Sequence, residues 1–393
     1  MIDAPAARRL CIALIADHQK TLIREGRLGP DTLITRHLGA GDQPLAIEED
    51  TLGFDSLSLL DLILVVNRYF ALSESGIEDY LFVQRDLDQW ADLLVKHFEI
   101  IGDAASITFS TSGSTGAAKT IRHPRAVLEG EADVIHDLLA PAPGARVLSL
   151  VPPQHIYGFL WSVLFPNRSG MPVIALDTGA PSALSRHATA GDIVLGTPYL
   201  WEKAAAFGVE LPAGITGICS GGPTTAATWD AIRKTGVSTI LEVYGSTETG
   251  GIATRSAPSE PFQLMPHLKQ RVTDIIRAAT GETLPLQDNL AWCDVRMFNV
   301  EGRKDTVVQV AGTNVNIDEV SRTILASHLV KDCAVRLGDD RLKAFVVPKD
   351  TTAPNVETEL REALSTLPAV ARPDQITFGP ELPRTPTGKP AAW

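Results

Sequence analysis

A loop rich in glycine and hydroxyl residues, ending in lysine, constrains this chain more than any other feature. Residues 107–119 have the sequence ITFSTSGSTGAAK, in which an apolar, β-prone stretch leads into the loop. Glycine lets a backbone approach a ligand closely, successive backbone N–H groups form a concave anion site, and lysine adds a point charge. The loop therefore predicts a polyphosphate site. Its candidate binding residues are Ser112, Gly113, Ser114, Thr115, Gly116 and Lys119.

Two phosphate-loop patterns compete for this segment. The Walker pattern G-x-x-x-x-G-K-[ST] nearly fits from Gly113 to Thr120, but Ala118 stands where its second glycine is required. A second ATP-binding pattern, [ST]-S-G-[ST]-T-G-x-x-K, is matched at every fixed position from Ser112 to Lys119. The remaining alternative is a glycine- and serine-rich surface turn. The second pattern is favoured because a chance match at all its positions is uncommon.

Composition excludes several classes of function. The chain has 393 residues, of which 44% are hydrophobic, so it can bury large cores in two or three domains. A net charge of −12 disfavours a nucleic acid partner. No apolar run approaches the roughly 18–20 residues of a membrane span. The four cysteines are far apart and form no C-x-x-C pair, which predicts a reducing, cytoplasmic setting and no structural zinc.

Three regions differ in their pattern along the chain. Residues 1–100 predict helices over 6–24, from Asp55 or Ser56 to Phe70, and over 87–98. From residue 106, short β-branched runs alternate with helical stretches, which predicts an α/β domain with a largely parallel sheet. The expected strands are 147–151, 173–176, 193–195, 215–219 and 239–243, and the expected helices lie near 122–139, 155–165, 198–207 and 224–235.

The remaining residues predict a small α+β domain. A hairpin over 291–311 precedes a helix near Asp318, strands at 332–337 and 342–347, and a helix near 355–366. We expect domain boundaries at 1–100, 101–302 and 303–393. Ligands of parallel sheets bind at the carboxyl ends of strands. The loops at 110–119, 219–223 and 244–250 each follow an expected strand, so we expect them to form the site.

Further motifs are ambiguous when each is taken alone. The segment YGSTETGG at 244–251 offers a tyrosine that could stack on a purine and a glutamate that could bind Mg²⁺, or it is simply a capped turn. The segment SGGP at 220–223 is a tight turn. His155 begins an apolar helix and could be a half-buried core residue. Arg303 and Asp305 could form a surface ion pair, and Lys389 could be a solvated tail residue.

Taken in order, these motifs resemble the adenylate-forming superfamily. That family includes acyl- and aryl-CoA synthetases, luciferases and the adenylation domains of peptide synthetases. The resemblance covers about residues 105–393 and rests on S-G-S-T-G-x-x-K, H-x-Y-G, G-G-P, Y-G-S-T-E-T, G-R-x-D and P-x-T-x-x-G-K. It implies a large adenylation domain, truncated at its N-terminal side, and a small mobile C-terminal domain.

The resemblance also implies a role for each matching residue. Ser112 to Gly116 and Lys119 would bind the β- and γ-phosphates of ATP. The turn of Gly221, Gly222 and Pro223 would lie beside the adenine. The remaining implied roles are Tyr244, with Gly245, Ser246 and Thr247, at the adenine; Glu248 on Mg²⁺; Asp288 and Arg303 on the ribose; Asp305 as hinge; Gly312 in the loop of the thiol step; His155 at the acyl pocket; and Lys389 at the carboxylate and α-phosphate.

The implied reaction joins a carboxylic acid to a thiol. The acid would first form an acyl-adenylate, and the thiol of CoA, or of 4′-phosphopantetheine on a carrier protein, would then displace AMP. Mg²⁺ and lysine would offset the repulsion between the carboxylate and the phosphates. The run HIYGFLWSVLFP at 155–166 also resembles ligases of aryl-polyene pigment pathways in secondary metabolism, which favours an aromatic or unsaturated acid.

Some features depart from the family pattern. Ala118 replaces the usual proline before the phosphate-loop lysine, and only Asp288 remains of a usual Thr-Gly-Asp. The 106 residues before the loop do not alternate between strand and helix, so we expect the ordinary N-terminal subdomain to be absent or replaced. An adenylating enzyme with another nucleophile, and a degenerate fold acting as a carrier-docking scaffold, remain as alternatives. Intact Lys119, Glu248, Arg303 and Lys389 argue against the scaffold.

Residues 1–100 have a resemblance of their own. The segment LGFDSL at 52–57, followed by an amphipathic helix, is similar to the L-G-x-D-S-L motif of acyl carrier proteins. That resemblance implies that Ser56 carries 4′-phosphopantetheine, so that the chain's own N-terminal domain, or a separate carrier protein, is a partner. The alternative is that Asp55 or Ser56 serves only as the helix N-cap.

We predict that Lys389→Ala abolishes adenylation and spares the thiol step. Lys389 lies in a glycine-flanked tail, from which it can reach the α-phosphate in only one orientation of the small domain. The two steps are separated by measuring ATP–pyrophosphate exchange and, independently, thioester formation from a supplied acyl-adenylate. Wild-type exchange in the variant would contradict this role.

Overall fold

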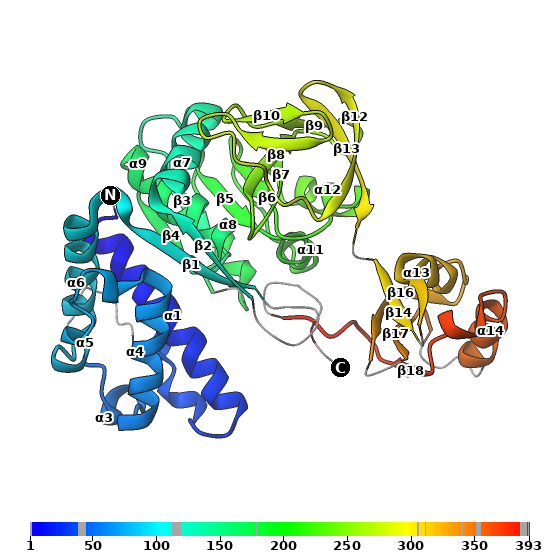
Figure 1. The fold of residues 1–393 in the computed structure, drawn as a ribbon, viewed down its shortest axis with the longest axis horizontal. Coiled ribbons are helices and arrows are strands. Elements are labelled where there is room, and N and C mark those ends of the chain that lie inside the picture. The colour runs from blue at the N-terminus through cyan, green and yellow to red at the C-terminus, as the bar shows by residue number, and fades with distance from the viewer. Residues whose placement is uncertain are drawn as a thin grey trace. The chain divides into compact units, whose positions relative to one another are not determined.

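The protein folds into two compact units (Figure 1). The computed structural model describes residues 2–37, 45–111, 119–177, 179–304, 306–310, 312–338, 341–350, 355–385, 391 and 393. The larger unit comprises Met1–Arg271 and Ile275–Leu284. The smaller unit comprises Val272–Asp274 and Pro285–Trp393.

The first hundred residues are helical where the structure describes them. The three helices expected there are confirmed as α1 (Ala4–Arg24), α4 (Ser56–Phe70) and α6 (Leu87–Ile101). Each begins after an aspartate N-cap, and the Asp55 carboxylate accepts the Ser58 N–H at 2.7 Å. Shorter turns join them: η1 (Pro30–Thr32), α2 (Ile34–His37), α3 (Glu49–Leu52), η2 (Leu72–Glu74), α5 (Tyr80–Val83) and η3 (Gly102–Ala104). Among the described residues, no helix has the length and apolarity to cross a membrane.

These helices share one hydrophobic core with the α/β part of the chain. Helix α6 packs along α1, and α4 packs against the first strand (Figure 1). The Phe70 ring of α4 lies 6.1 Å from the Phe98 ring of α6, and the Tyr69 ring lies 5.6 Å from Phe109 on the first strand. Because the core is continuous, the helices and the hairpin that follows them form one packed body.

The strand that leads into the predicted polyphosphate loop belongs to a two-stranded hairpin, which corrects our expectation that this strand lies in the parallel sheet. Among the strands that the structure describes, β1 (Ser106–Thr111) pairs only with β2 (Lys119–Pro124); the two are antiparallel, with Thr111 opposite Lys119. The helix expected near 122 also begins later, as α7 (Arg125–Leu139). Pro124 explains the shift, because the residue before a proline is driven out of helical conformation.

The central sheet of the larger unit runs in the order β9-β8-β7-β6-β5-β3-β4. All five strands expected from the β-branched runs are confirmed and pair in parallel, whereas β8 and β9 are antiparallel. The strands are β3 (Val147–Ser149), β4 (Val173–Ala175), β5 (Ile193–Gly196), β6 (Thr216–Cys219), β7 (Thr239–Ser246), β8 (Gly250–Arg255) and β9 (Phe262–Leu264), followed by the short β10 (Leu268–Arg271) and β11 (Asp274–Arg277).

Helices connect the parallel strands. They are α8 (Ile156–Phe159), a π-helical stretch (Leu160–Leu164), α9 (Phe165–Ser169), η5 (Pro181–Ala183), α10 (Leu184–His187), α11 (Pro198–Ala206) and α12 (Ala226–Lys234). The helix expected over 155–165 is therefore interrupted by a π-turn. Pro166 explains the interruption, because it has no N–H to donate to the preceding turn. Within this stretch the buried Ser162 hydroxyl donates to the Gly158 carbonyl at 2.7 Å.

The smaller unit has the α+β character that the sequence predicted. Two hairpins are followed by a three-stranded sheet, in which β16 and β17 are antiparallel and β17 and β18 are parallel. Its elements are β12 (Asp288–Asp294), β13 (Met297–Arg303), β14 (Val307–Val310), β15 (Thr313–Asn316), α13 (Ile317–Leu325), β16 (Val330–Leu337), β17 (Leu342–Pro348), α14 (Val356–Leu364), η6 (Ala369–Ala371) and β18 (Gln375–Phe378). Val320, Ile324 and Leu360 lie in its separate core.

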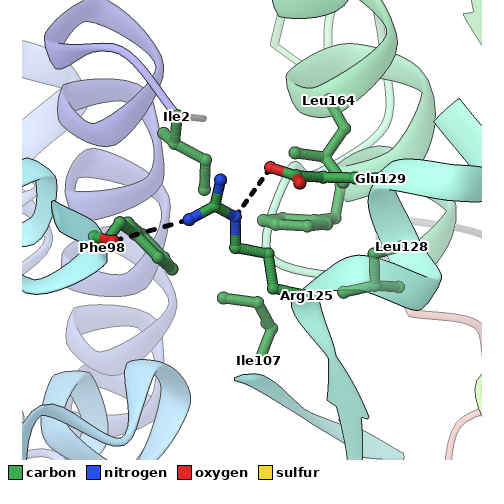
Figure 2. A pocket seen from close by; sticks show the side chains of 8 residues that line it. Ile2, Phe98, Ile107, Arg125, Leu128, Glu129 and Leu164 are labelled. Atoms are coloured by element: carbon green, nitrogen blue, oxygen red, sulfur yellow. Dashed lines mark hydrogen bonds and ion pairs between the residues drawn. The ribbon is translucent and has the colours of Figure 1, made fainter. Parts of the chain in front are cut away.

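One arginine links the N-terminal helices to the α/β part. Arg125 begins α7, and its guanidinium donates to the Gly102 carbonyl at 3.3 Å, just beyond α6. Its Nε also donates to the Glu129 carboxylate at 2.7 Å (Figure 2). The side chain lines a small cavity with Ile2 and Phe98 (Figure 2). Arg125 therefore adds a positively charged donor at the carbonyl end of helix α6, where a cation is favoured.

We predict that Arg125→Met lowers the free energy of unfolding by about 1–3 kcal/mol, because it removes the charge-assisted hydrogen bond to Glu129 and the bond to the Gly102 carbonyl. Urea unfolding followed by tryptophan fluorescence measures the change. Arg168→Met is the matched control, since Arg168 pairs with Asp133 on the surface, where both side chains are at least half exposed. It should cost no more than about 0.5 kcal/mol. Equal effects of the two substitutions would contradict the linking role.

Candidate functional site

The base of the polyphosphate loop is fixed by the β1–β2 hairpin. Lys119 is exposed and begins β2, directly opposite Thr111 at the end of β1. The predicted loop residues Ser112, Gly113, Ser114, Thr115 and Gly116 lie outside the described residues. The hairpin therefore determines where the loop leaves and rejoins the body, and it places the lysine at that junction.

The tyrosine–glutamate motif forms the tight connection between β7 and β8. Tyr244 lies half-buried in β7, with its ring 5.5 Å from that of Phe262. Gly245 pairs with Gly251 after a bulge, and a Cβ on Gly245 would collide with the Gly250 carbonyl, so only glycine fits there. Glu248 is half-buried within the connection.

The connection is closed by hydrogen bonds between Ser246 and Thr249. The Thr249 hydroxyl accepts the Ser246 N–H at 3.1 Å and donates to the Gly250 carbonyl at 2.9 Å. Thr249 is buried, whereas Ser246 and Thr247 are half-buried.

The glycine–proline turn lies beside this motif, as the strand-end rule required. Residues 221–223 follow β6, which is the parallel neighbour of β7. The buried Ser220 hydroxyl donates to the Val243 carbonyl at 2.8 Å, immediately before Tyr244. The structure therefore brings Gly221, Gly222 and Pro223 to the strand end that carries Tyr244.

His155 is exposed at the start of α8, in the N-cap position. This placement differs from the half-buried core residue that was its alternative. Gly158, three residues on, packs so closely that a Cβ would collide with the Pro152 carbonyl. The Tyr157 hydroxyl lies 3.2 Å from the carbonyl oxygens of Gly196 and Ile218. The tyrosine therefore lies across the carboxyl ends of β5 and β6, and burial raises its pKa well above the usual value.

Three buried side chains that the sequence did not single out hold the Thr247–Gly251 loop. His123 of β2 donates from Nε2 to the Thr247 carbonyl at 2.7 Å. Arg277 of β11 donates to the Thr249 carbonyl at 3.0 Å. The Glu131 carboxyl of α7 accepts the Gly251 N–H at 2.7 Å. The only local signal was a charged residue on the apolar face of α7, since Glu131 is 1% exposed.

Burial governs the ionisation of this group of residues. Desolvation raises the pKa of Glu131 to about 8, although the Gly251 N–H and the positive charge of Arg277 act in the opposite direction. Burial also lowers the pKa of His123, offset in part by its bond to Thr247. Arg277 is in addition paired with Glu282 at 3.0 Å. Near neutral pH, Glu131 therefore holds its proton and His123 is uncharged.

The smaller unit brings two predicted residues together. Asp288 and Arg303 lie directly opposite each other across the β12–β13 hairpin. Gly312 lies between β14 and β15 with a φ of 79°, which glycine adopts without strain. Asp305 and Lys389 lie outside the described residues. Ser56, in the larger unit, is exposed in the first turn of α4.

The donor groups of the β7–β8 connection suit a hard cation. Glu248 offers a carboxylate and Thr247 a hydroxyl, and Mg²⁺ is usually held by one or two carboxylates together with phosphate oxygens and water. Within the part of the chain that the structure describes, no three His, Cys, Asp or Glu side chains gather to hold a metal by themselves. The residues present therefore fit Mg²⁺ brought in with a nucleotide.

We predict that Glu131→Gln changes how stability depends on pH. The pKa of Glu131 is about 8 in the folded protein and 4.5 ordinarily. Between these two pH values the folded protein therefore binds one proton that the unfolded chain does not. Wild-type stability should therefore lose up to about 1.4 kcal/mol per pH unit between these values, an effect that glutamine removes. The melting temperature of Glu131→Gln relative to wild type should rise from pH 5 to pH 8 and then level off. Glu99→Gln, on the surface of α6, is the control, and parallel profiles for all three proteins would contradict the prediction.

Comparisons with known proteins agree with this geometry. The model of the AMP-binding enzyme family matches residues 76–284, and that of the AMP-binding enzyme C-terminal domain matches residues 319–389. A 4-coumarate–CoA ligase of Cereibacter sphaeroides is 44% identical over 100% of this chain and 97% of its own length. A 4-coumarate–CoA ligase of Rhodobacter capsulatus is 40% identical over 98% of this chain and 99% of its own length.

A solved structure shows the same fold. The O-succinylbenzoate coenzyme A synthetase of Bacillus subtilis in complex with AMP has a TM-score of 0.56 and 17% identity, and the match covers 80% of this chain and 75% of that one. The family match begins within the N-terminal helices, upstream of the position near 105 that the motifs suggested. From these matches, together with the strand-end site, the chain belongs to the AMP-binding enzyme family.

Proposed function

We propose that this enzyme, an ATP-dependent carboxylic acid–CoA ligase of the AMP-forming type, activates 4-coumarate or a closely related aromatic propenoic acid. The observation that carries the proposal is the 44% identity to a 4-coumarate–CoA ligase over the whole of this chain and 97% of that one. Because the identity extends over the full length, it includes the scattered segments from which an acyl pocket is built. It therefore bears on the acid as well as on the ATP chemistry.

The reaction has two steps. A carboxylate oxygen attacks the α-phosphorus of ATP and pyrophosphate leaves, giving the acyl-adenylate. The CoA sulfur then attacks the acyl carbon, its proton is lost, and AMP leaves with the electrons of the broken acyl–phosphate bond. The first step brings negative groups together, so it depends on positive charge placed in advance.

Each group at the strand ends has a place in that scheme. In the proposal, Ser112 to Gly116 and Lys119 bind the outer phosphates, and Tyr244 lies on the adenine beside the turn of Gly221, Gly222 and Pro223. The bond from Ser220 to Val243 supports this pairing, because it fixes the turn to the strand of Tyr244. Glu248 binds Mg²⁺, which supplies charge neutralisation of the phosphates when it is present.

In the proposal, the smaller unit contributes the residues that bind the ribose of ATP and the catalytic lysine. Asp288 and Arg303 are proposed for the ribose hydroxyls, and their direct pairing across one hairpin supports a joint role. Asp305 is proposed as the hinge, Lys389 as the residue of the first step, and the loop at Gly312 as part of the second. A rotation of the small domain that replaces Lys389 by the Gly312 loop at the reacting groups would separate adenylation from thiol attack.

An aromatic side chain supports the choice of an aromatic acid. The Tyr157 hydroxyl bridges the carbonyls of Gly196 and Ile218, so its ring is held at the carboxyl ends of β5 and β6. Ligands of such sheets bind beyond these ends. His155, exposed two residues earlier, is proposed to line or gate the entrance for the acid. Planar rings pack well against a fixed aromatic wall.

A panel of acids tests the proposed function. Purified protein is incubated with ATP, Mg²⁺, CoA and 4-coumarate, cinnamate, benzoate or octanoate, and both pyrophosphate exchange and CoA thioester are measured. We expect kcat/KM for 4-coumarate to exceed that for octanoate at least tenfold, which corresponds to about 1.4 kcal/mol. Exchange without thioester would indicate another nucleophile. No exchange with any acid would support a scaffold.

We further propose that residues 1–100 form a carrier-protein-like helical domain whose attachment residue is Ser56. Two features support this. Ser56 is exposed in the first turn of α4, and Asp55 caps that helix through Ser58, so the serine hydroxyl is left available to a modifying enzyme. Leu57, Leu60 and Leu64 form an exposed apolar stripe along the same helix. A 4′-phosphopantetheine arm there would present a thiol at high effective concentration.

Intact mass decides whether Ser56 is modified. The protein is incubated with CoA and a phosphopantetheinyl transferase, and we expect a gain equal to one phosphopantetheine that disappears in Ser56→Ala. Ser58→Ala is the matched control, since Ser58 is buried in the same helical turn. No gain, or a gain that persists in Ser56→Ala, would show that these helices serve only to cover the hairpin.

A further inference from the structure

We propose that His123, Glu131 and Arg277 are positioning residues that hold the Thr247–Gly251 loop, and with it the Glu248 carboxylate, in fixed register with the hairpin that carries Lys119. The inference rests on the proposed assignment of Lys119 to the phosphates of ATP and of Glu248 to Mg²⁺. It adds three residues from three separate elements to that site.

The loop is held by its backbone, at every second residue. The Thr247 carbonyl accepts from His123 at 2.7 Å, the Thr249 carbonyl accepts from Arg277 at 3.0 Å, and the Gly251 N–H donates to Glu131 at 2.7 Å. Each of the three residues is at most 6% exposed. Water therefore cannot easily replace any of these partners, and a lost bond leaves a buried polar group unsatisfied.

Glu248 lies between the two anchored carbonyls. With Thr247 held on one side and Thr249 on the other, the backbone on both sides of Glu248 is restrained. A metal-binding carboxylate is effective only when its oxygens are placed in advance, because Mg²⁺ demands near-ideal octahedral geometry. The two anchors therefore act on the direction in which the Glu248 side chain leaves the loop.

His123 joins the two halves of the site. It lies on the same strand as Lys119, and since side chains alternate along a strand, residues 119, 121 and 123 share one face. Its ring also packs 5.9 Å from Phe109 on the partner strand. One hydrogen bond thus connects the base of the phosphate loop to the glutamate loop, and any shift of one is transmitted to the other.

Glu131 and Arg277 restrain the opposite end of the loop. The Glu131 carboxyl lies so close to Gly250 and Gly251 that a Cβ on either residue would collide with it. Arg277 makes a second hydrogen bond, from Nε to the Glu282 carboxylate at 3.0 Å, which helps to fix the orientation of its guanidinium group. The charged group that acts on Glu131 is Arg277, and those that act on His123 are Arg277, Glu282 and Glu248.

The test removes one donor while keeping the packing. His123→Phe retains a flat ring against Phe109 and loses the N–H to Thr247, whereas His123→Gln offers an amide N–H in its place. His136→Phe is the matched control, because His136 is a half-buried histidine of α7 that bonds to Ser169, away from the loop. All four proteins, wild type included, are compared by hydrogen–deuterium exchange and by calorimetric titration with ATP and Mg²⁺.

In His123→Phe we expect faster exchange in peptides that cover 246–251, with the rest of the larger unit unchanged. The dissociation constant for ATP with Mg²⁺ and the half-saturating Mg²⁺ concentration should each rise about tenfold, the loss expected for one buried hydrogen bond. The KM for the acid should stay within about twofold, since the anchors hold the nucleotide loop. His123→Gln should recover most of the loss, and His136→Phe should match wild type.

Two results would overturn the proposal. Unchanged exchange over 246–251 in His123→Phe would show that His123 does not hold the loop. Faster exchange with unchanged ATP and Mg²⁺ titrations would show that the loop does not position the nucleotide site. Failure of the proposed function appears separately, as wild-type protein that binds ATP and Mg²⁺ yet forms no thioester with any acid of the panel.

Discussion

The packing of Phe109 is the interaction on which the rest of the larger unit depends. Its ring lies 5.6 Å from Tyr69 of α4, 5.9 Å from His123 of β2 and 5.4 Å from Phe159 of α8. A two-stranded hairpin is marginally stable by itself, so β1 and β2 need this packing on both sides. The hairpin in turn carries Lys119 at its base, which means that the N-terminal helices help to determine where the phosphate loop begins.

A second constraint comes from the parallel sheet. Because β5, β6 and β7 run in the same direction, their carboxyl ends meet at one edge, where Tyr157, the turn at 221–223 and Tyr244 all lie. The strands themselves contribute little chemistry. They place short loops from distant parts of the sequence side by side, and single hydrogen bonds such as Ser220 to Val243 then fix the loops to one another. An adenylating enzyme needs this order, because its rate depends on charges that are in position before the acid attacks.

Much of this organisation was predictable from the sequence. Aspartate caps and amphipathic spacing predicted α1, α4 and α6, and β-branched runs predicted β3 to β7, because these signals are local. The same reasoning failed for the hairpin. A β-prone stretch before a glycine-rich loop is equally consistent with a strand of the main sheet, and nothing within residues 106–124 indicates that β1 pairs only with β2. Pairing is a tertiary choice, made here by the apolar surface that the N-terminal helices and α8 provide.

The sequence by itself determined the family and the order of the motifs, and it predicted candidate nucleotide-binding residues, since each motif is a contiguous segment whose residue types indicate its chemistry. Only the tertiary structure decided which side chains hold those segments together. His123 and Thr247 are 124 positions apart, and Glu131 and Gly251 are 120 apart. A single histidine in a strand carries no local sign of such a contact, and a glutamate on the apolar face of a helix does not reveal which group it will bind. The physical reason is that these anchors act on backbone groups, and a backbone N–H or carbonyl is the same in every residue that could have stood there.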